Sequence, residues 1–126
     1  MPQTVVRVFC EADGTVPLMD WLDDLEGRER RAFAKCLQLI RRLSHLGNEL
    51  RRPSADILRD GIYELRAKIG RVNYRVLYFF YAPNAACITH GFTKEGKVPG
   101  SEIDRAMKRK SLVTANSTKH TAFWEK

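Results

Sequence analysis

The sequence predicts a single α+β domain in which an antiparallel sheet carries two helices on one face. Three segments between residues 62 and 92 have the alternating or β-branched pattern of strands. Two amphipathic segments precede them between residues 17 and 46, with apolar residues three and four positions apart. The chain has 126 residues, of which 44% are hydrophobic, so it is long enough for one domain around one core.

The first half of the chain predicts one short strand and two helices. Residues 4–9 are β-branched and apolar, as in a strand. Pro17 suits the first turn of a helix that ends near Gly27. A longer helix is expected from about Arg28 to Leu46, with Gly47 as its stop. The apolar residues expected on its inner face are Phe33, Cys36, Leu37, Ile40, Leu43 and Leu46.

The second half predicts a three-stranded meander and a last helix. Residues 62–69 alternate apolar with charged side chains, as a half-buried strand does. Residues 74–81 are apolar almost throughout, so this strand should be central and largely enclosed. Residues 86–92 form the third strand, and Pro99 opens a short C-terminal helix.

The domain is expected to span residues 1–112. Apolar periodicity stops there, so residues 113–126 are expected to form a flexible C-terminal tail. The two N-terminal helices should cover one face of the sheet as a helical hairpin, which leaves the other face at least partly open. Function should therefore reside on that second face.

The charge distribution favours a polyanionic partner. The net charge is +7, yet the first thirty residues carry seven acidic and three basic side chains, so the rest of the chain holds all of the cationic excess. Such an excess suits nucleic acid or a membrane surface. No apolar run approaches the roughly 20 residues that span a bilayer, and the N-terminus lacks the pattern of a secretory signal. We therefore expect a cytoplasmic protein without a membrane partner.

The cysteines and the absence of metal motifs narrow the chemistry. Cys10, Cys36 and Cys87 are odd in number and widely spaced, which argues against a disulfide framework. Cys36 and Cys87 lie in apolar patterns and should be small core residues. The sequence has no Cys/His pair, no carboxylate cluster with metal spacing and no phosphate-binding loop, so we expect neither a metal nor a cofactor.

Basic residues gather on the predicted strands. Arg66, Lys68, Arg71 and Arg75 lie within ten residues of one another. Arg75 stands in a segment that is otherwise too apolar to be a solvent edge, so its charge needs a partner or an open cleft. The alternative is a solvated face on which the cations pair with acids such as Glu64. Clustered like charges repel one another unless an anion binds, which favours an anion site.

RNA cleavage is the chemistry that such a face can support. The ribose 2′-hydroxyl would attack its own 3′-phosphate, which requires a proton acceptor, cations around the phosphorus and a proton donor for the leaving oxygen. Arginine clamps phosphate through two hydrogen bonds, and lysine among other cations can transfer protons. Lys94 and Lys97 should approach the same end of the sheet. His90 lies within a predicted strand and is a further candidate, with a purely structural role as the alternative.

Four motifs in register resemble the phage-derived, HigB-like branch of the RelE/ParE toxin superfamily. The motifs are GIYELR at 61–66, YRVLYFF at 74–80, HGFTK at 90–94, and Pro99 followed by Glu102, Ile103, Arg105 and Ala106. The resemblance covers roughly residues 4–112 and implies a compact, RelE-like fold of the microbial-RNase type. It also implies a toxin of a type II toxin–antitoxin system, which inhibits translation by cutting mRNA on the ribosome. A cognate helix-turn-helix antitoxin would neutralise it.

By position, the resemblance assigns the activity to Arg66, Arg75, Lys94 and Lys97, and His90 is added to them as a histidine within a predicted strand. The catalytic candidates are Arg75, Arg66, Lys94, Lys97 and His90. Lys68, Arg71 and Arg59 are the expected RNA-binding residues. Glu95 stands where a second consecutive lysine is common in the family, which weakens the local positive charge. Together these residues describe a metal-independent endoribonuclease.

Two other functions are consistent with the same residues. A ParE-like toxin inhibits DNA gyrase by binding and has no chemistry of its own, but its sheet face would lack clustered cations. A non-catalytic RNA-binding or phage accessory protein would leave RNA intact in the presence of translating ribosomes.

Overall fold

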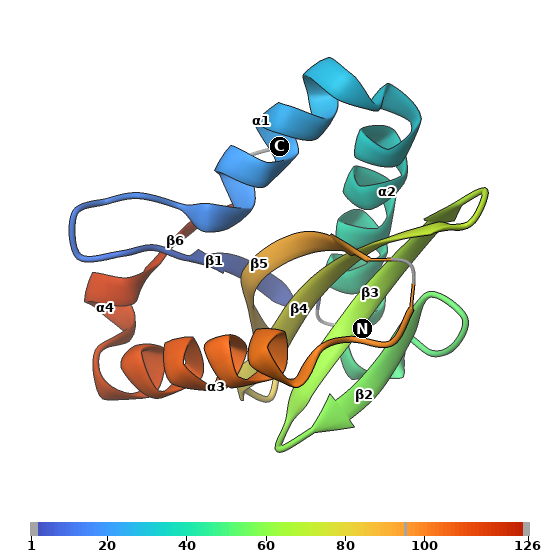
Figure 1. Cartoon of the computed structure of the whole chain (residues 1–126). Helices are drawn as coiled ribbons and strands as arrows, with labels where there is room; N and C mark the ends of the chain where they lie inside the picture. Colours follow the sequence, from blue (N-terminus) through green and yellow to red (C-terminus); the bar gives the residue numbers. More distant parts are fainter. Residues whose placement is uncertain (1–2, 95, 125–126) are drawn as a thin grey trace.

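A computed structural model describes residues 3–94 and 96–124 of the chain (Figure 1). The elements are, in order, β1 (Val5–Phe9), α1 (Pro17–Arg28), α2 (Arg30–Leu46), the 3-10 helix η1 (Gly47–Glu49), β2 (Ala55–Arg59), β3 (Ile62–Ile69), β4 (Val72–Ala82), β5 (Ala85–Lys94), α3 (Gly100–Ala115), α4 (Ser117–His120) and β6 (Thr121–Phe123). The strands form one sheet in the order β2-β3-β4-β5-β1-β6. The predicted α+β class is confirmed.

The central meander agrees with the prediction, whereas the position of β1 does not. Strands β3, β4 and β5 pair antiparallel, and β3 has the predicted bounds. Strand β1 pairs parallel with β5, with Val6 opposite Ala86, so the sheet is mixed and not wholly antiparallel. The segment between β1 and β5 includes α1, α2 and strands β2 to β4, and it is long enough to allow parallel pairing. The apolar pattern of a strand indicates its buried faces but does not identify its neighbour.

Strand β2 was missing from the sequence-based prediction. It pairs antiparallel with β3 across a turn at Asp60 and Gly61, whose φ angles are 53° and 79°. Positive φ at both central residues is the requirement of a type I′ hairpin turn, for which Asp-Gly is a favoured pair. The turn signal was therefore present in the sequence, next to a strand of only five residues.

The prediction of a flexible tail over residues 113–126 is wrong for residues 113–123, which form parts of α3, α4 and β6. Helix α3 continues to Ala115, and β6 pairs antiparallel with β1 at the edge of the sheet. His120 stacks on Phe9 with ring centroids 5.8 Å apart, and its Nδ1 donates to the carbonyl oxygen of Cys10 at 3.1 Å. A helix of four residues and a strand of three are too short to produce a detectable period.

Helices cover both faces of the sheet. On one face, helix α1 packs mainly on β5 and helix α2 packs mainly on β3. Helix α3 lies across the opposite face, in front of the sheet in Figure 1, and buries Ile103 and Ala106 against Leu77 and Phe79. The face that was expected to be open is therefore closed where α3 packs. No helix among the described residues is long and apolar enough to cross a membrane.

The buried face of α2 is shifted from the predicted one. Its buried residues are Ala32, Cys36, Leu39, Ile40 and Leu43. Leu46, predicted to be buried, is 40% exposed. Leu37 is half-buried, because its position lies at the border of the apolar stripe.

We predict that Ile40→Ala lowers the free energy of unfolding by about 2–5 kcal/mol, because it leaves a cavity in place of a fully buried side chain. Leu37→Ala should cost less, since half-buried Leu37 loses fewer contacts. Urea denaturation of both variants measures the difference. An equal or larger loss for Leu37→Ala would show that the buried face of α2 is assigned wrongly.

Candidate functional site

A cleft of about 470 Å³ opens on the α3 face of the sheet, beside that helix. It is lined by Asp56, Leu58, Arg59, Glu64, Arg66, Arg75, Gly96, Lys97, Val98 and Ile103. These residues come from β2, β3, β4, α3 and the loop after β5. Four of them are cationic and two are carboxylates, so this cleft has an excess of positive charge.

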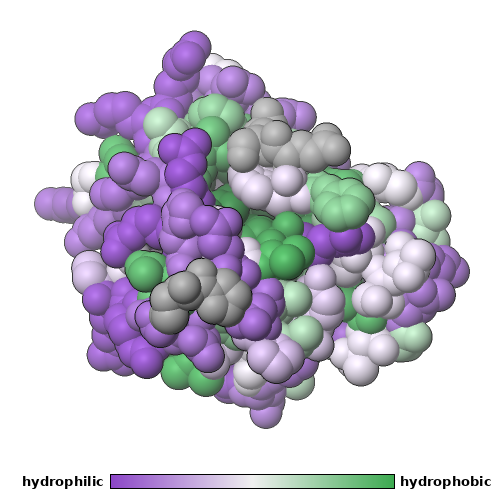
Figure 2. Space-filling view, turned by 180° about the vertical axis from the view of Figure 1, so that it is seen from behind, coloured by the Kyte–Doolittle hydropathy of each residue, from purple (hydrophilic) through white to green (hydrophobic). Residues whose placement is uncertain are grey.

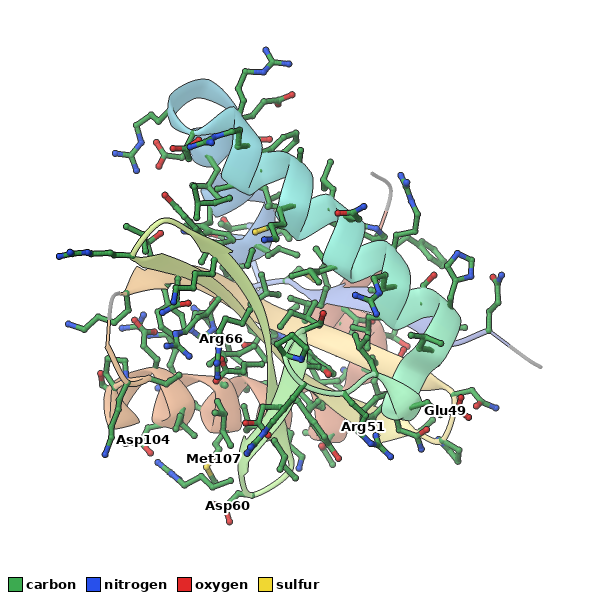
Figure 3. All side chains as sticks on the ribbon, turned by 90° about the vertical axis from the view of Figure 1, so that its right-hand side faces the viewer. Glu49, Arg51, Asp60, Arg66, Asp104 and Met107 are labelled. Atoms are coloured by element: carbon green, nitrogen blue, oxygen red, sulfur yellow. The ribbon has the colours of Figure 1, made fainter. Side chains whose placement is uncertain are left out.

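The register of the central strands brings two of the predicted residues together. Arg66 of β3 lies directly opposite Arg75 of β4, so both side chains project from the same face of the sheet. Glu64 precedes Arg66 by two positions and shares that face. Arg66 is labelled in Figure 3, on the side of the molecule formed by β2 and β3, with Asp104 and Met107 of α3 below it.

Glu64 holds both arginines. It is 1% exposed, and its Oε1 accepts hydrogen bonds from Nη1 of Arg75 at 2.6 Å and from Nε of Arg66 at 2.9 Å. Nη2 of Arg75 donates to the carbonyl oxygen of Gly96 at 2.7 Å. Arg75 is itself 6% exposed, although it lines the cleft.

Arg75 consequently has the structural role that the sequence analysis gives as the alternative, because it pairs with Glu64. Its guanidinium neutralises a buried carboxylate, and it also holds the loop that follows β5. That loop carries Lys97, which is exposed and lines the cleft. Arg75 therefore positions the loop of Lys97. Its own guanidinium is buried, whereas that of Arg66 is more exposed to the cleft.

Arg59 joins β2 to α3. Its guanidinium donates to Asp60 at 3.1 Å and to Asp104 at 2.7 Å, and it also contacts the sulfur of Met107. These hydrogen bonds, with that of Asp104 the strongest, raise the pKa of Arg59 above its usual value. Figure 3 shows Asp60, Asp104 and Met107 along the same border of the molecule. Arg59 thus lines the cleft as a partner of carboxylates.

The remaining predicted cations do not line the cleft. Lys94 is exposed near the end of β5, opposite Asn73 of β4. Arg71 is exposed in the turn between β3 and β4, and Lys68 lines a different groove, described below. Glu95 lies outside the described residues.

His90 connects β5 to α3 inside the protein. It is 4% exposed, its Nε2 lies 3.0 Å from Oε1 of Glu102, and its Nδ1 lies 2.9 Å from Oγ1 of Thr89. Burial, reinforced by the positive charge of Arg109, lowers the pKa of His90 to about 4. The imidazole is therefore neutral at neutral pH, and it is not part of the lining of the cleft.

The cysteines occupy the core. Cys36 and Cys87 are fully buried, as predicted, and burial raises the pKa of each thiol to about 12. They are therefore protonated thiols at neutral pH. Within residues 3–94 and 96–124, no group of three or more His, Cys, Asp or Glu side chains is arranged to hold a metal ion.

The family of the chain follows from comparison with known proteins. Residues 20–111 match the family model described as "Phage derived protein Gp49-like (DUF891)". The chain belongs to the Gp49-like family. This is a family of toxin-like proteins related to RelE, and the matched region contains every residue of the cleft. A search of curated proteins gives no match.

Sequence reasoning missed part of the cleft. Glu64 was considered only as a surface ion-pair partner, whereas it is the buried centre of the polar cluster. Leu58, Val98 and Ile103 form an apolar wall that comes from three separate segments. The alternation of Glu64 with apolar residues in β3 indicates which face of the strand Glu64 lies on. It does not indicate that α3 and the loop after β5 close over that face.

We predict that Arg75→Met lowers the free energy of unfolding by about 3–5 kcal/mol, because Glu64 loses its buried partner. Combining it with Glu64→Leu should restore part of this loss, since neither charge then remains buried. Urea denaturation of the single and double variants gives the coupling between the two residues. Arg71→Met, in an exposed turn, is the matched control and should change stability by less than about 0.5 kcal/mol. Additive effects of the two substitutions would contradict the ion pair.

We also predict that His90 makes the free energy of unfolding fall in acid. Its pKa is about 4 in the folded chain and near the ordinary histidine value of 6.5 in the unfolded chain, so the unfolded chain takes up the proton first. Stability should therefore fall as the pH drops from about 6.5 towards 4, by at most about 1.4 kcal/mol per pH unit. His90→Gln should flatten this dependence of Tm on pH. Parallel curves for the two proteins would mean that His90 does not contribute.

Proposed function

We propose that this chain is the HigB-like toxin of a type II toxin–antitoxin system and that it inhibits translation by cutting mRNA on the ribosome. The observation that carries the proposal is the cleft, in which Arg66, Arg75 and Lys97 converge on one cationic hollow. Membership of a toxin-like family supports the same reading and implies an antitoxin partner, which we propose is a helix-turn-helix protein.

The proposed reaction needs only the RNA and the side chains of the cleft. The ribose 2′-oxygen forms a bond to the adjacent phosphorus and loses its proton, while the bond from phosphorus to the 5′-oxygen breaks and that oxygen gains a proton. The products are a 2′,3′-cyclic phosphate and a 5′-hydroxyl, with no redox step and no metal required.

Each cation of the cleft has a suitable role in this reaction. Arg66 is half-exposed and can donate to a phosphate oxygen, while Arg75 neutralises Glu64 behind it, so that the carboxylate does not cancel the charge of Arg66. Guanidinium groups stay protonated in proteins, whereas an ammonium among other cations can exchange its proton. Lys97 is thus the cationic side chain of the cleft that is suited to proton transfer.

We predict that Lys97→Met or Arg66→Gln slows mRNA cleavage about 100- to 1,000-fold, as expected for loss of one transition-state donor. The measurement is primer extension on mRNA in a reconstituted translation system, together with chemical mapping of the product ends. Lys108→Met, an exposed position on α3 that does not line the cleft, is the matched control and should cut at the wild-type rate.

Two outcomes would overturn the proposal. Intact mRNA after incubation of folded wild-type protein with translating ribosomes would favour a non-catalytic RNA-binding protein. Loss of gyrase supercoiling activity on addition of the protein, with mRNA intact, would favour a ParE-like inhibitor.

A further inference from the structure

A second hollow, which we call the α2–β3 groove, lies at the border between helix α2 and strand β3. It measures about 450 Å³ and is lined by Lys35, Gln38, Leu39, Arg42, Pro53, Ser54, Arg66, Lys68 and Asn73. Four of these residues are cationic and none is a carboxylate, in contrast to the cleft, where two carboxylates offset part of the charge. Seen from behind in Figure 2, hydrophilic side chains gather on the side where α2 lies.

The groove exists because β2 is shorter than β3. Pairing between the two strands ends with Ala55 opposite Leu65, so the outer edge of β3 beyond that point has no neighbouring strand. Helix α2 lies alongside this edge, and Nζ of Lys35 donates to the carbonyl oxygen of Lys68 at 3.2 Å. The carbonyl oxygen of Lys68, at the edge of the sheet, thereby holds the ammonium group of Lys35 at the wall of the groove.

Two of the four groove cations, Lys35 and Arg42, are held by uncharged groups, whereas Arg66 pairs with Glu64. Nη1 of Arg42 donates to the hydroxyl of Ser54 at 3.0 Å, and Lys35 donates to a backbone carbonyl. Within the described parts of the chain, no ion pair within 4.0 Å includes Lys35, Arg42 or Lys68. Their positive charges are therefore available to an external anion.

The groove adjoins the cleft at a single residue. Arg66 lines both hollows, and its backbone N–H donates to the carbonyl oxygen of Ser54, another residue of the groove wall. A chain of phosphates that passes Arg66 in the cleft can thus continue along Lys68 and Arg42. The polyanion that enters the cleft in the proposed function is an RNA strand.

We propose that the α2–β3 groove binds the phosphate backbone of the RNA strand whose scissile phosphate lies in the cleft. The inference rests on the proposed function for the identity of the strand. No aromatic side chain lines the groove, so bases have no surface on which to stack. Contacts to phosphate position a nucleic acid without reading its sequence, and the groove therefore supplies affinity but no sequence preference.

The test is the binding of a fluorescent 2′-O-methyl RNA oligonucleotide, which cannot be cut because its 2′-oxygen is blocked. The variant combines Lys35→Gln, Arg42→Gln and Lys68→Gln. Each lost phosphate contact should reduce the slope of log affinity against log salt concentration by about 0.7, so the triple variant should lose roughly 2 units of slope. The matched control combines Arg30→Gln, Arg41→Gln and Lys108→Gln, which removes the same charge from exposed positions outside the groove.

The groove variant should bind RNA more weakly than the control and with a smaller salt slope, and both effects should be the same for oligonucleotides of different sequence. Equal affinities and slopes for the two triple variants would overturn the proposal, because net charge alone would then explain the binding. A loss confined to one RNA sequence would overturn it as well.

Failure of the groove and failure of the proposed function are distinguishable. If the two triple variants bind alike while wild-type protein cuts mRNA, the groove proposal fails and the function stands. If the groove variant alone loses RNA binding while wild-type protein cuts no mRNA, the groove stands and the nuclease assignment fails.

Discussion

A carboxylate that is removed from water needs a cationic partner, and Glu64 obtains one from Arg75. Burying either charge alone would cost several kcal/mol, whereas the pair at 2.6 Å compensates both. The same carboxylate orients Arg66, and the same guanidinium holds the carbonyl of Gly96. The two arginines and the loop that carries Lys97 are thereby organised around one buried oxygen.

Helix α3 supplies the wall against which this cluster is built. It packs through Ile103 and Ala106, and the polar contacts that join it to the sheet include one between Arg59 and Asp104 and one between His90 and Glu102. The cleft lies where this cover ends. Since both polar contacts involve predicted RNA-binding or catalytic residues, positions that look functional in the sequence here also hold the helix in place.

The two hollows differ in how their charge is balanced. In the cleft, Glu64 and Asp56 offset part of the positive charge, and Glu64 holds Arg66 and Arg75 in defined orientations. In the α2–β3 groove, Arg42 is held by a hydroxyl and Lys35 by a backbone carbonyl, so no carboxylate offsets either charge. Precise orientation suits a reacting phosphate, while uncompensated charge suits phosphates that only need to be bound.

The sequence by itself determined the central meander, the helices and the clustering of cations on β3 and β4. These features depend on local periodicity and on the constant alternation of side chains along a strand. It also placed Arg66 and Arg75 among the clustered cations of two neighbouring strands, while their register came from the structure. What it determined was therefore local: which residues form an element and which way each side chain points.

Only the tertiary structure decided how those elements meet. The parallel pairing of β1 with β5, the strand β6 and the closure of α3 over part of the sheet join segments far apart in the chain. The tertiary structure also decided the roles of three residues. Arg75 became the partner of a buried acid, His90 became an enclosed link to α3, and Lys35, absent from every motif, came to line a groove with Lys68. The physical reason is that burial and pairing depend on which distant groups approach a side chain, and one-dimensional patterns carry no distances between them.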